Sequence, residues 1–482
     1  MYQIIKGAFT MRNEHPVKQT IKHKQAKKAK AGRGQKLHWW QLSLIGIGSV
    51  IGAGFFLGTG LSIERAGPSV LILYVIAGII GIIVFSALAE MSVHDKESGS
   101  FRKYAKQAFG HSFGFMSGWM YWVSGILIMG SEITALALFT QFWFPNFPLW
   151  ILMAVYAAAG FGINLLGVSN FGKIESLFAI VKISTLVAFV TFGGLLLFGV
   201  LPQETAVSDT TFTTWFPNGF MGSWTAMIFV LFSFGGIAIV GLMATELENR
   251  EETPKAGGIM VILLTILYGI SLFFVIKIVP WNMISEDESP FVTALSSFNI
   301  PYVSTLFNVI LITAAFSTMV GALFSITKVL VSLANDGDAP KGLAVFNSRG
   351  VAIKSLAVNA IAVTVAIIVS YVLPNKVYEY LTTAAGIMLI LNWAMILGSQ
   401  IKNRPEYTIE KEKTHFIMIG YPYTSYLGIA LIALTIIGAF FQGSERIGVL
   451  ISFGMTLFIF IGYYVMKLFK EHRFKEDKLQ EE

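Results

Sequence analysis

The chain contains 482 residues, of which 55% are apolar and only 13% are charged. Because a typical soluble domain has about 25% charged residues, this composition indicates an integral membrane protein and excludes a disordered chain and an ordinary nucleic-acid-binding protein. The chain has no cysteine, which excludes a disulfide scaffold, thiolate metal sites and thiol catalysis. The net charge of +7 must first be compared with membrane topology, because bilayers orient chains by Lys and Arg.

The first 38 residues are strongly basic, with ten Lys or Arg and one acid, Glu14. They contain no apolar stretch like the core of a cleaved signal peptide. We therefore expect residues 1–38 to form a cytoplasmic tail, with a loose attraction to anionic lipid headgroups as a further role. A nucleic-acid-binding arm is disfavoured because the chain enters the membrane directly afterwards.

Apolar segments then recur at near-regular intervals and predict twelve transmembrane helices within one transporter domain, residues 39–467, followed by a cytoplasmic tail, residues 468–482. The predicted spans are residues 40–63, 68–89, 115–143, 149–167, 173–201, 224–245, 257–279, 304–333, 355–373, 378–400, 423–442 and 447–467.

The distribution of basic residues orients these spans. With a cytoplasmic start, thirty Lys or Arg fall on the inner side or at the inner boundary. Only four fall outside, namely Arg65, Lys277, Lys376 and Arg446. This bias follows the positive-inside rule and predicts that both termini are cytoplasmic.

Two spans carry glycines that favour an interrupted helix. The first reads LSLIGIGSVIGAGFFLGTG, and the sixth has a Gly235–Gly236 pair framed by Phe232 and Phe234. Small residues also serve close helix packing in membranes, which is the alternative reading of either span alone. Because the two spans lie at equivalent points of two halves, we expect an inverted-repeat transporter with its binding site at breaks near residues 50–54 and 235–236.

The unwound backbone at such breaks indicates the class of substrate. Amide N–H groups at the start of one half-helix favour an anionic group, and carbonyl oxygens at the end of the other favour a cation. An α-amino acid carries both groups a short distance apart. It therefore fits better than a sugar, a nucleobase or an inorganic ion.

Two charged residues fall deep inside the predicted spans. Lys182 lies in the middle of the fifth span, where a lysine costs about 2.5–3.5 kcal/mol on insertion scales and usually faces the bundle interior. We expect it to exchange a proton, with a structural lysine as the alternative. Glu132, in the third span, either accepts hydrogen bonds from neighbouring helix ends or handles substrate or protons.

Glu175 and Glu246 lie near the inner ends of the fifth and sixth spans. They are candidates for a cytoplasmic gate, with solvation or pairing to Arg250 or Lys173 as alternatives.

The seven histidines lie in tails, loops or interfaces and suggest no metal site. No phosphate-binding loop is present either, so ATP is not expected as the direct energy source.

Several motifs resemble those of bacterial amino acid permeases, in the amino acid transporter branch of the amino acid–polyamine–organocation superfamily. The resemblance runs from about Leu37 to the twelfth span and includes the third-span Glu132. Its motifs, in order, are GSVIGAGFFLGTG (48–60), ALAEM and SGSFRKYA (87–105), IESLFAIVK (174–182), FSFGGI (232–237), ATELENR and TPKA (244–256) and LANDGDAPK (333–341).

The resemblance implies a five-plus-five inverted repeat, with broken first and sixth helices and repeats at residues 39–201 and 224–400, followed by two extra helices within residues 423–467. In that family, amides after the first break hold the substrate carboxylate, carbonyls at both breaks hold its ammonium group, and an aromatic side chain caps the site. The substrate-binding positions implied here are Val50, Gly52, Ala53, Gly54, Phe232, Ser233 and Gly235.

Within this set, Ala53 and Gly54 would donate to the carboxylate, Gly52 would allow close approach, and Phe232 would cap the site. Lys182 matches a fifth-span lysine that stands where sodium-coupled relatives bind sodium. The resemblance therefore implies proton coupling, with the proton as coupling ion and no other cofactor.

Together these features predict a permease that imports neutral, small L-amino acids across the bacterial plasma membrane by proton symport. The resemblance would often place an acid at Ala238, and the site around Ala53, Ala238 and the Gly235–Gly236 pair offers no charge for a cationic or acidic side chain. A neutral amino acid is therefore favoured, with serine, threonine or another small one ahead of bulky aromatic ones. An exchanger or facilitator with Lys182 as a fixed cation is the main alternative, followed by a sensor; an enzyme is least favoured. The expected partners are the amino acid and membrane lipid, without nucleic acid or an obligatory protein.

Overall fold

The computed structural model describes residues 37–94, 101–166, 171–200, 214–244, 247–285, 288–298, 300–373, 376–409, 416–441 and 443–481. Over these ranges the chain is helical, and a single bridge between Leu37 and Leu247 is the one strand-like pairing. The helices are α3 (Trp39–Val50), α4 (Ala53–Phe56), α5 (Gly58–Ala66), α6 (Val70–His94), α7 (Phe101–Phe109), α8 (His111–Gln141), α9 (Leu149–Leu166), α10 (Phe171–Leu197), α11 (Gly219–Phe232), α12 (Ile237–Met243), α13 (Thr253–Ile278), α14 (Pro290–Ser296), α15 (Val303–Asn335), α16 (Ile353–Val372), α17 (Val377–Ile409), α18 (Tyr423–Phe441) and α19 (Gly443–Glu481).

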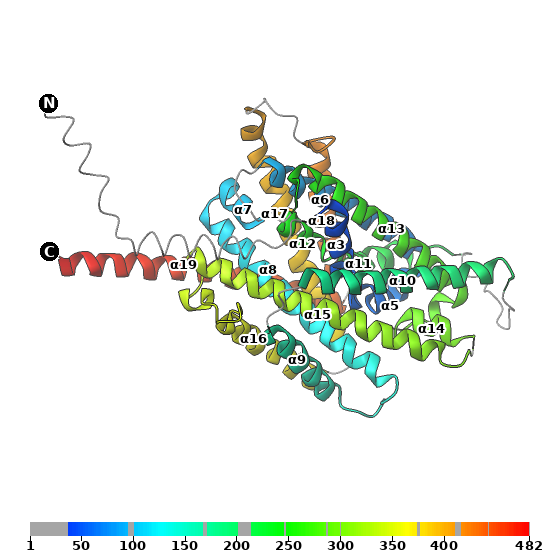
Figure 1. Ribbon diagram of the computed structural model, residues 1–482. Coiled ribbons are helices and arrows are strands. Elements are labelled where there is room, and N and C mark those ends of the chain that lie inside the picture. The colour runs from blue at the N-terminus through cyan, green and yellow to red at the C-terminus, as the bar shows by residue number, and fades with distance from the viewer. Residues whose placement is uncertain are drawn as a thin grey trace.

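The helices pack into one bundle, with α9 and α16 side by side at its edge and α19 extending beyond it (Figure 1). Among the described residues, ten helical stretches are long and apolar enough to cross a membrane. Helices suit this environment because every backbone polar group inside a span is bonded within the helix itself. The expected all-α architecture is confirmed.

Each of the twelve predicted spans overlaps at least one helix. The first and sixth spans are divided into short pieces, and α3, α11 and α12 have only 12, 14 and 7 residues. These pieces are too short to span a membrane singly, which is why the long stretches number ten. The count of twelve and the inverted repeat stay predictions.

Both predicted breaks are present. In the first span, α3 ends at Val50 and α4 begins at Ala53, with Gly52 between them in an extended conformation at φ −147° and ψ −160°. In the sixth span, α11 ends at Phe232 and α12 begins at Ile237. The interruptions therefore fall at the glycines that the sequence singled out.

The two broken helices pack against each other. α3 contacts α12, and α5 contacts α11, so the first half of each broken helix lies beside the second half of the other. This pairing makes them antiparallel and brings the two breaks to the same level. A Cβ built on Gly236 would lie 2.7 Å from the carbonyl oxygen of Ser49, so the backbones approach each other closely there.

Candidate functional site

A pocket lies at the level of the two breaks. Six of the residues predicted from the sequence line it: Val50, Gly54, Glu132, Glu175, Phe232 and Gly235. α8, α15 and α17 supply most of the remaining lining, including Tyr121, Thr318, Ser325 and Leu389. The structure therefore brings together residues from both predicted repeats around one cavity, which is the usual setting of a small-molecule site.

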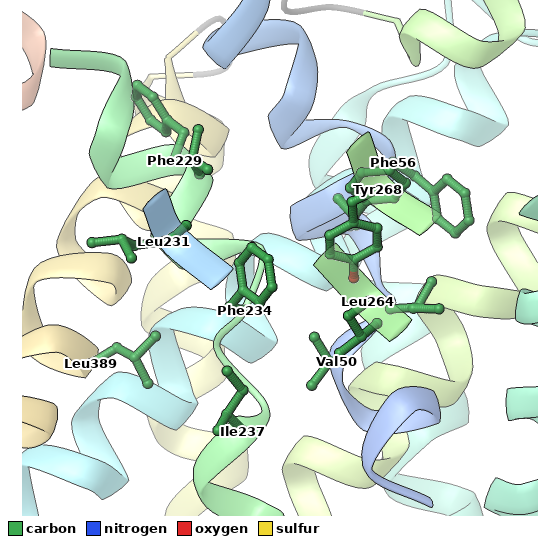
Figure 2. Close-up of a cluster of buried hydrophobic side chains, with 14 of the residues drawn as sticks. Val50, Phe56, Phe229, Leu231, Phe234, Ile237, Leu264, Tyr268 and Leu389 are labelled. Atoms are coloured by element: carbon green, nitrogen blue, oxygen red, sulfur yellow. The ribbon is translucent and has the colours of Figure 1, made fainter. Parts of the chain in front are cut away.

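The sixth-span break forms one wall of this pocket. Figure 2 shows the chain passing from the helix that carries Leu231 into a coil at Phe234 and then into the helix that begins at Ile237, with Val50 nearby. The ring of Phe232 covers Gly54, because a Cβ built on Gly54 would lie 2.9 Å from Phe232 Cε1. A glycine at position 54 thus allows the ring to lie against the first-span backbone.

The freed amide at the first break is bonded to Glu132. Both carboxylate oxygens of Glu132 accept from the Ala53 N–H, at 3.1 Å each. Glu132 is 2% exposed, so a charge-assisted bond from a helix start offsets part of the penalty of burying it. The amide predicted to hold the substrate carboxylate therefore holds a protein carboxylate in this structure.

Carbonyl groups at and just after the first break also accept hydrogen bonds from side chains. Tyr378 of α17 donates to the Ala53 carbonyl at 3.0 Å, and Ser233 donates to the Gly54 carbonyl at 2.8 Å. The Thr318 hydroxyl of α15 lies 3.1 Å from the Ile51 carbonyl oxygen. The backbone around the first break is thus bonded by side chains of α15, α17 and the sixth-span break, which meets the requirement for irregular structure at membrane depth.

Lys182 reaches the same backbone from α10. Its Nζ donates to the Gly48 carbonyl at 2.6 Å and to Thr318 Oγ1 at 2.9 Å, and the side chain is 1% exposed. Its ammonium group therefore ties α10 to the end of α3 and to α15. Lys182 lies behind the pocket wall rather than in it, as do Gly52, Ala53 and Ser233.

Glu175 differs from its predicted surroundings. It is 3% exposed rather than solvated, its Oε1 lies 4.0 Å from Lys182 Nζ, and its Oε2 accepts from Ser317 at 3.1 Å. A seven-residue separation on α10 places Glu175 and Lys182 on one helix face, two turns apart. The ion pair found for Glu175 is thus with Lys182. Glu246 lies outside the described residues, so its predicted gate role has no structural counterpart here.

Sequence reasoning missed Thr318 and Tyr378, which bind the first-span backbone from α15 and α17. Thr318 falls in an apolar stretch, and Tyr378 begins a predicted span. Polar side chains inside spans usually face the bundle interior, which is the signal that could have marked Thr318. Within the described ranges no cluster of three His, Asp or Glu residues is placed to hold a metal ion.

Comparison with known proteins agrees with this geometry. The family described as "Amino acid permease" matches residues 41–480. "Uncharacterized transporter YcgH" of Bacillus subtilis (strain 168) is 40% identical over 428 residues, which cover 88% of this chain and 93% of the relative. "Aromatic amino acid transport protein AroP" of Escherichia coli (strain K12) is 33% identical over 440 residues, or 91% and 95% of the two chains.

The match covers almost the whole described chain, including both breaks and every helix that lines the pocket. Both relatives are named as transporters, so the protein is a transporter rather than an enzyme. Its apolar helices and its bacterial relatives indicate a multi-pass protein of the plasma membrane. The chain belongs to the amino acid permease family of the amino acid–polyamine–organocation superfamily.

Proposed function

We propose that this permease imports neutral L-amino acids by proton symport, through twelve spans arranged as a five-plus-five inverted repeat with two extra helices. The observation that carries the proposal is the buried contact of Lys182 Nζ with the Gly48 carbonyl, beside a pocket at two broken helices. Both termini are cytoplasmic in this proposal, in keeping with the bias of basic residues.

The proposed coupling follows from the strength of hydrogen bonds. A protonated Lys182 makes charge-assisted bonds to Gly48 and Thr318, which are roughly twice as strong as those of a neutral amine. Loss of the proton therefore loosens the end of α3 from α10 and α15. In this proposal α3 is held in place when Lys182 is charged and is released when Lys182 is neutral. Proton release is thereby linked to movement of the helix bundle.

The proposed substrate carries no net side-chain charge. The two carboxylates of the pocket, Glu132 and Glu175, are already in contact with Ala53 and Ser317, respectively. Val50, Phe232 and Leu389 give the pocket an apolar surface. Gly125, Gly321 and Ala322 in the same wall leave room beside the breaks.

Substitution of Lys182 by alanine tests the coupling. In liposomes that contain the purified protein, Lys182→Ala should abolish accumulation driven by a pH gradient, while counterflow exchange of the amino acid continues. Retained counterflow and a monodisperse elution profile serve as the folding controls. Full gradient-driven accumulation by the variant would reject the proton role of Lys182. Counterflow without accumulation by the unmodified protein would support an exchanger instead.

A competition panel of the twenty amino acids against labelled uptake tests the substrate class. We expect serine, threonine and other small neutral amino acids to compete best, and lysine, arginine, aspartate and glutamate to compete poorly. The AroP relatives are named for aromatic amino acids, so phenylalanine, tyrosine and tryptophan form the informative group. If these three competed more strongly than the small amino acids, the proposed small substrate would be rejected in favour of an aromatic one.

A further inference from the structure

A second cavity lies away from the breaks, where α9, α15 and α16 meet. Its volume is about 310 Å³, and since a single water needs roughly 10–15 Å³ it has room for a polar headgroup. Phe324, Val331 and Leu356 form an apolar part of its lining, and Lys328 and Arg349 add two cations. None of these residues lines the pocket at the breaks.

The two cations have no carboxylate partner among the described residues. Lys328 Nζ lies 4.4 Å from the centre of the Phe324 ring, and no ion pair is found for Lys328 or Arg349. The nearest acids along the chain, Asp336 and Asp338, pair instead with Arg102, and Asp338 also with His111. Both cationic side chains are exposed and so remain available to an anion.

The loop that carries Arg349 has a defined conformation. The Asn347 side chain accepts from the backbone N–H groups of Arg349 at 3.0 Å and of Val351 at 2.8 Å, and Gly350 has a φ of +75°. This turn holds Arg349 at the rim of the cavity, so less ordering is needed when a ligand binds.

The position of the cavity identifies the kind of ligand. Lys328 is two turns from the end of α15 at Asn335, and Leu356 is in the first turn of α16, so the cavity is at the ends of two spans. The outer face of α16 carries exposed apolar side chains along its length: Ile353, Ile361, Val365, Ile368 and Val372. A lipid whose headgroup occupies the cavity can lay an acyl chain along this face.

We propose that the cavity between α9, α15 and α16 binds the headgroup of an anionic phospholipid, with Lys328 and Arg349 contacting the phosphate. Basic pockets between helices at the cytoplasmic side of a membrane recognise such headgroups. The cations supply the preference for negative charge. The apolar lining and the face of α16 supply the preference for a lipid over a soluble phosphate.

Binding of phosphatidylglycerol to the purified protein in neutral detergent, followed by native mass spectrometry, tests the proposal. Each basic residue near an anionic lipid contributes roughly a factor of five in affinity, so Lys328→Gln with Arg349→Gln should weaken binding about 30-fold. The matched control, Lys402→Gln with Arg446→Gln, removes one exposed Lys and one exposed Arg elsewhere and should bind like the unmodified protein.

Lys328→Arg with Arg349→Lys keeps both charges and should retain binding, which separates charge recognition from misfolding. Unchanged affinity in the glutamine pair would overturn the proposal, as would equal binding of phosphatidylcholine. Glycerol phosphate has the headgroup charge without acyl chains. If it bound as tightly as phosphatidylglycerol, the cavity would be a soluble-phosphate site and not a lipid site.

Discussion

The Glu132 carboxylate occupies the position at which a half-helix start attracts negative charge. Its two oxygens lie 3.1 Å from the Ala53 nitrogen, and a Cβ built on Gly52 would lie 2.5 Å from Glu132 Oε1. The absence of a side chain at Gly52 therefore lets the carboxylate reach the amide. An amino acid substrate that uses the same N–H has to displace Glu132 from it.

Removal of this carboxylate should change both stability and ligand response. Glu132→Ala leaves the buried Ala53 N–H without a partner, which should lower the free energy of unfolding by about 1–3 kcal/mol. A substrate carboxylate then meets no competitor at that amide. We expect the rise in thermal unfolding temperature caused by saturating substrate to be larger in Glu132→Ala than in the unmodified protein, measured in detergent.

Two glycine variants provide the matched comparison for this contact. Gly52→Ala places its Cβ against Glu132 and also 2.9 Å from Thr318 Oγ1, so it should destabilise the break in the same direction. Gly258→Ala, in α13, meets nothing within 4 Å and should leave stability unchanged or slightly higher. An identical substrate-induced shift in Glu132→Ala and the unmodified protein would show that the substrate does not use the Ala53 amide.

At the residue scale, the sequence could predict which backbone groups would leave the helix, but not which side chains would form hydrogen bonds to them. Glycines near 50–54 and 235–236 marked the breaks because glycine tolerates non-helical backbone. The partners, such as Tyr378 on Ala53, come from helices far along the chain. Their positions depend on packing between helices, which no local pattern encodes.

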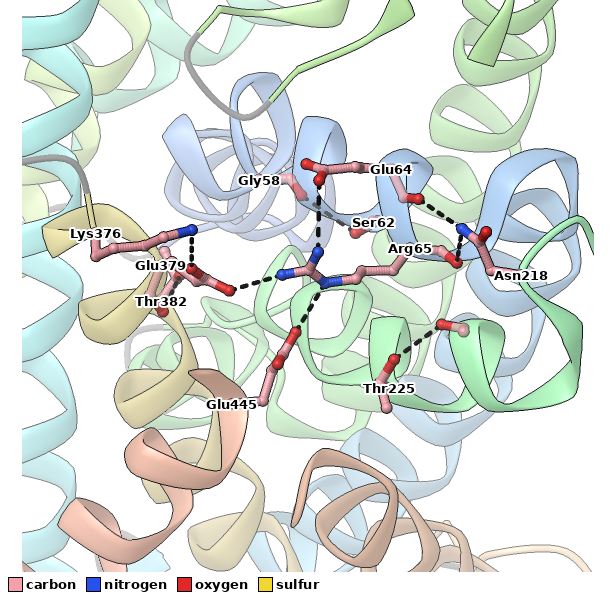
Figure 3. Close-up of polar contacts among 11 residues, drawn as sticks. Gly58, Ser62, Glu64, Arg65, Asn218, Thr225, Lys376, Glu379, Thr382 and Glu445 are labelled. Atoms are coloured by element: carbon pink, nitrogen blue, oxygen red, sulfur yellow. Dashed lines mark hydrogen bonds and ion pairs between the residues drawn. The ribbon is translucent and has the colours of Figure 1, made fainter. Parts of the chain in front are cut away.

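Three helices are joined at the end of α5 by a buried ion-pair cluster around Arg65 (Figure 3). Its guanidinium group donates to Glu379 of α17 at 2.9 Å and to Glu445 of α19 at 3.1 Å. The carboxylate side chains are 1% and 0% exposed, and Arg65 is 17% exposed. Lys376, which is 46% exposed, pairs with the other oxygen of Glu379 at 3.2 Å.

Removal of Arg65 should loosen the second half of the first span. Arg65→Ala leaves two buried carboxylates without their shared cation and should cost about 3 kcal/mol, the lower end for a broken buried pair because Arg65 is partly exposed. Thermal unfolding in detergent measures this loss. Lys376→Ala removes an exposed partner and should cost under about 1 kcal/mol.

A compensating variant distinguishes charge from packing in this cluster. Adding Glu379→Gln and Glu445→Gln to Arg65→Ala removes the two buried carboxylate charges and should recover most of the lost stability. A triple variant that is as unstable as Arg65→Ala would mean that the guanidinium acts by filling space between α5, α17 and α19 instead.

At the scale of elements, the apolar segments predicted the positions of the long helices but not the short helices between them. All twelve predicted spans overlap helices, since each depends on a long local stretch of apolar residues. The helices α7 and α14, with nine and seven residues, were not predicted. Such short helices depend on contacts with the bundle rather than on their own composition.

For the whole molecule, charge and hydropathy predict orientation together. Basic residues concentrate in every second loop between the predicted spans, and twelve predicted crossings would place these loops on one side of the membrane. The breaks leave this predicted alternation unchanged, because the proposed topology counts α3 to α5 as one crossing and α11 to α12 as another. The cavity lined by Lys328 and Arg349 falls on the same predicted basic side.

The lack of cysteine allows this orientation to be measured directly, because a single introduced thiol is the only one in the chain. Asn146→Cys lies in the exposed turn between α8 and α9, and Ser348→Cys in the exposed loop between α15 and α16. In intact cells a membrane-impermeant maleimide should label Asn146→Cys, because the proposed topology places that turn outside. It should label Ser348→Cys only after permeabilisation, because the positive-inside rule places the loop with Arg349 in the cytoplasm. The opposite pattern would mean that the topology is inverted. Labelling of both variants in intact cells would mean that the stretch from α9 to α15 makes one crossing fewer than proposed.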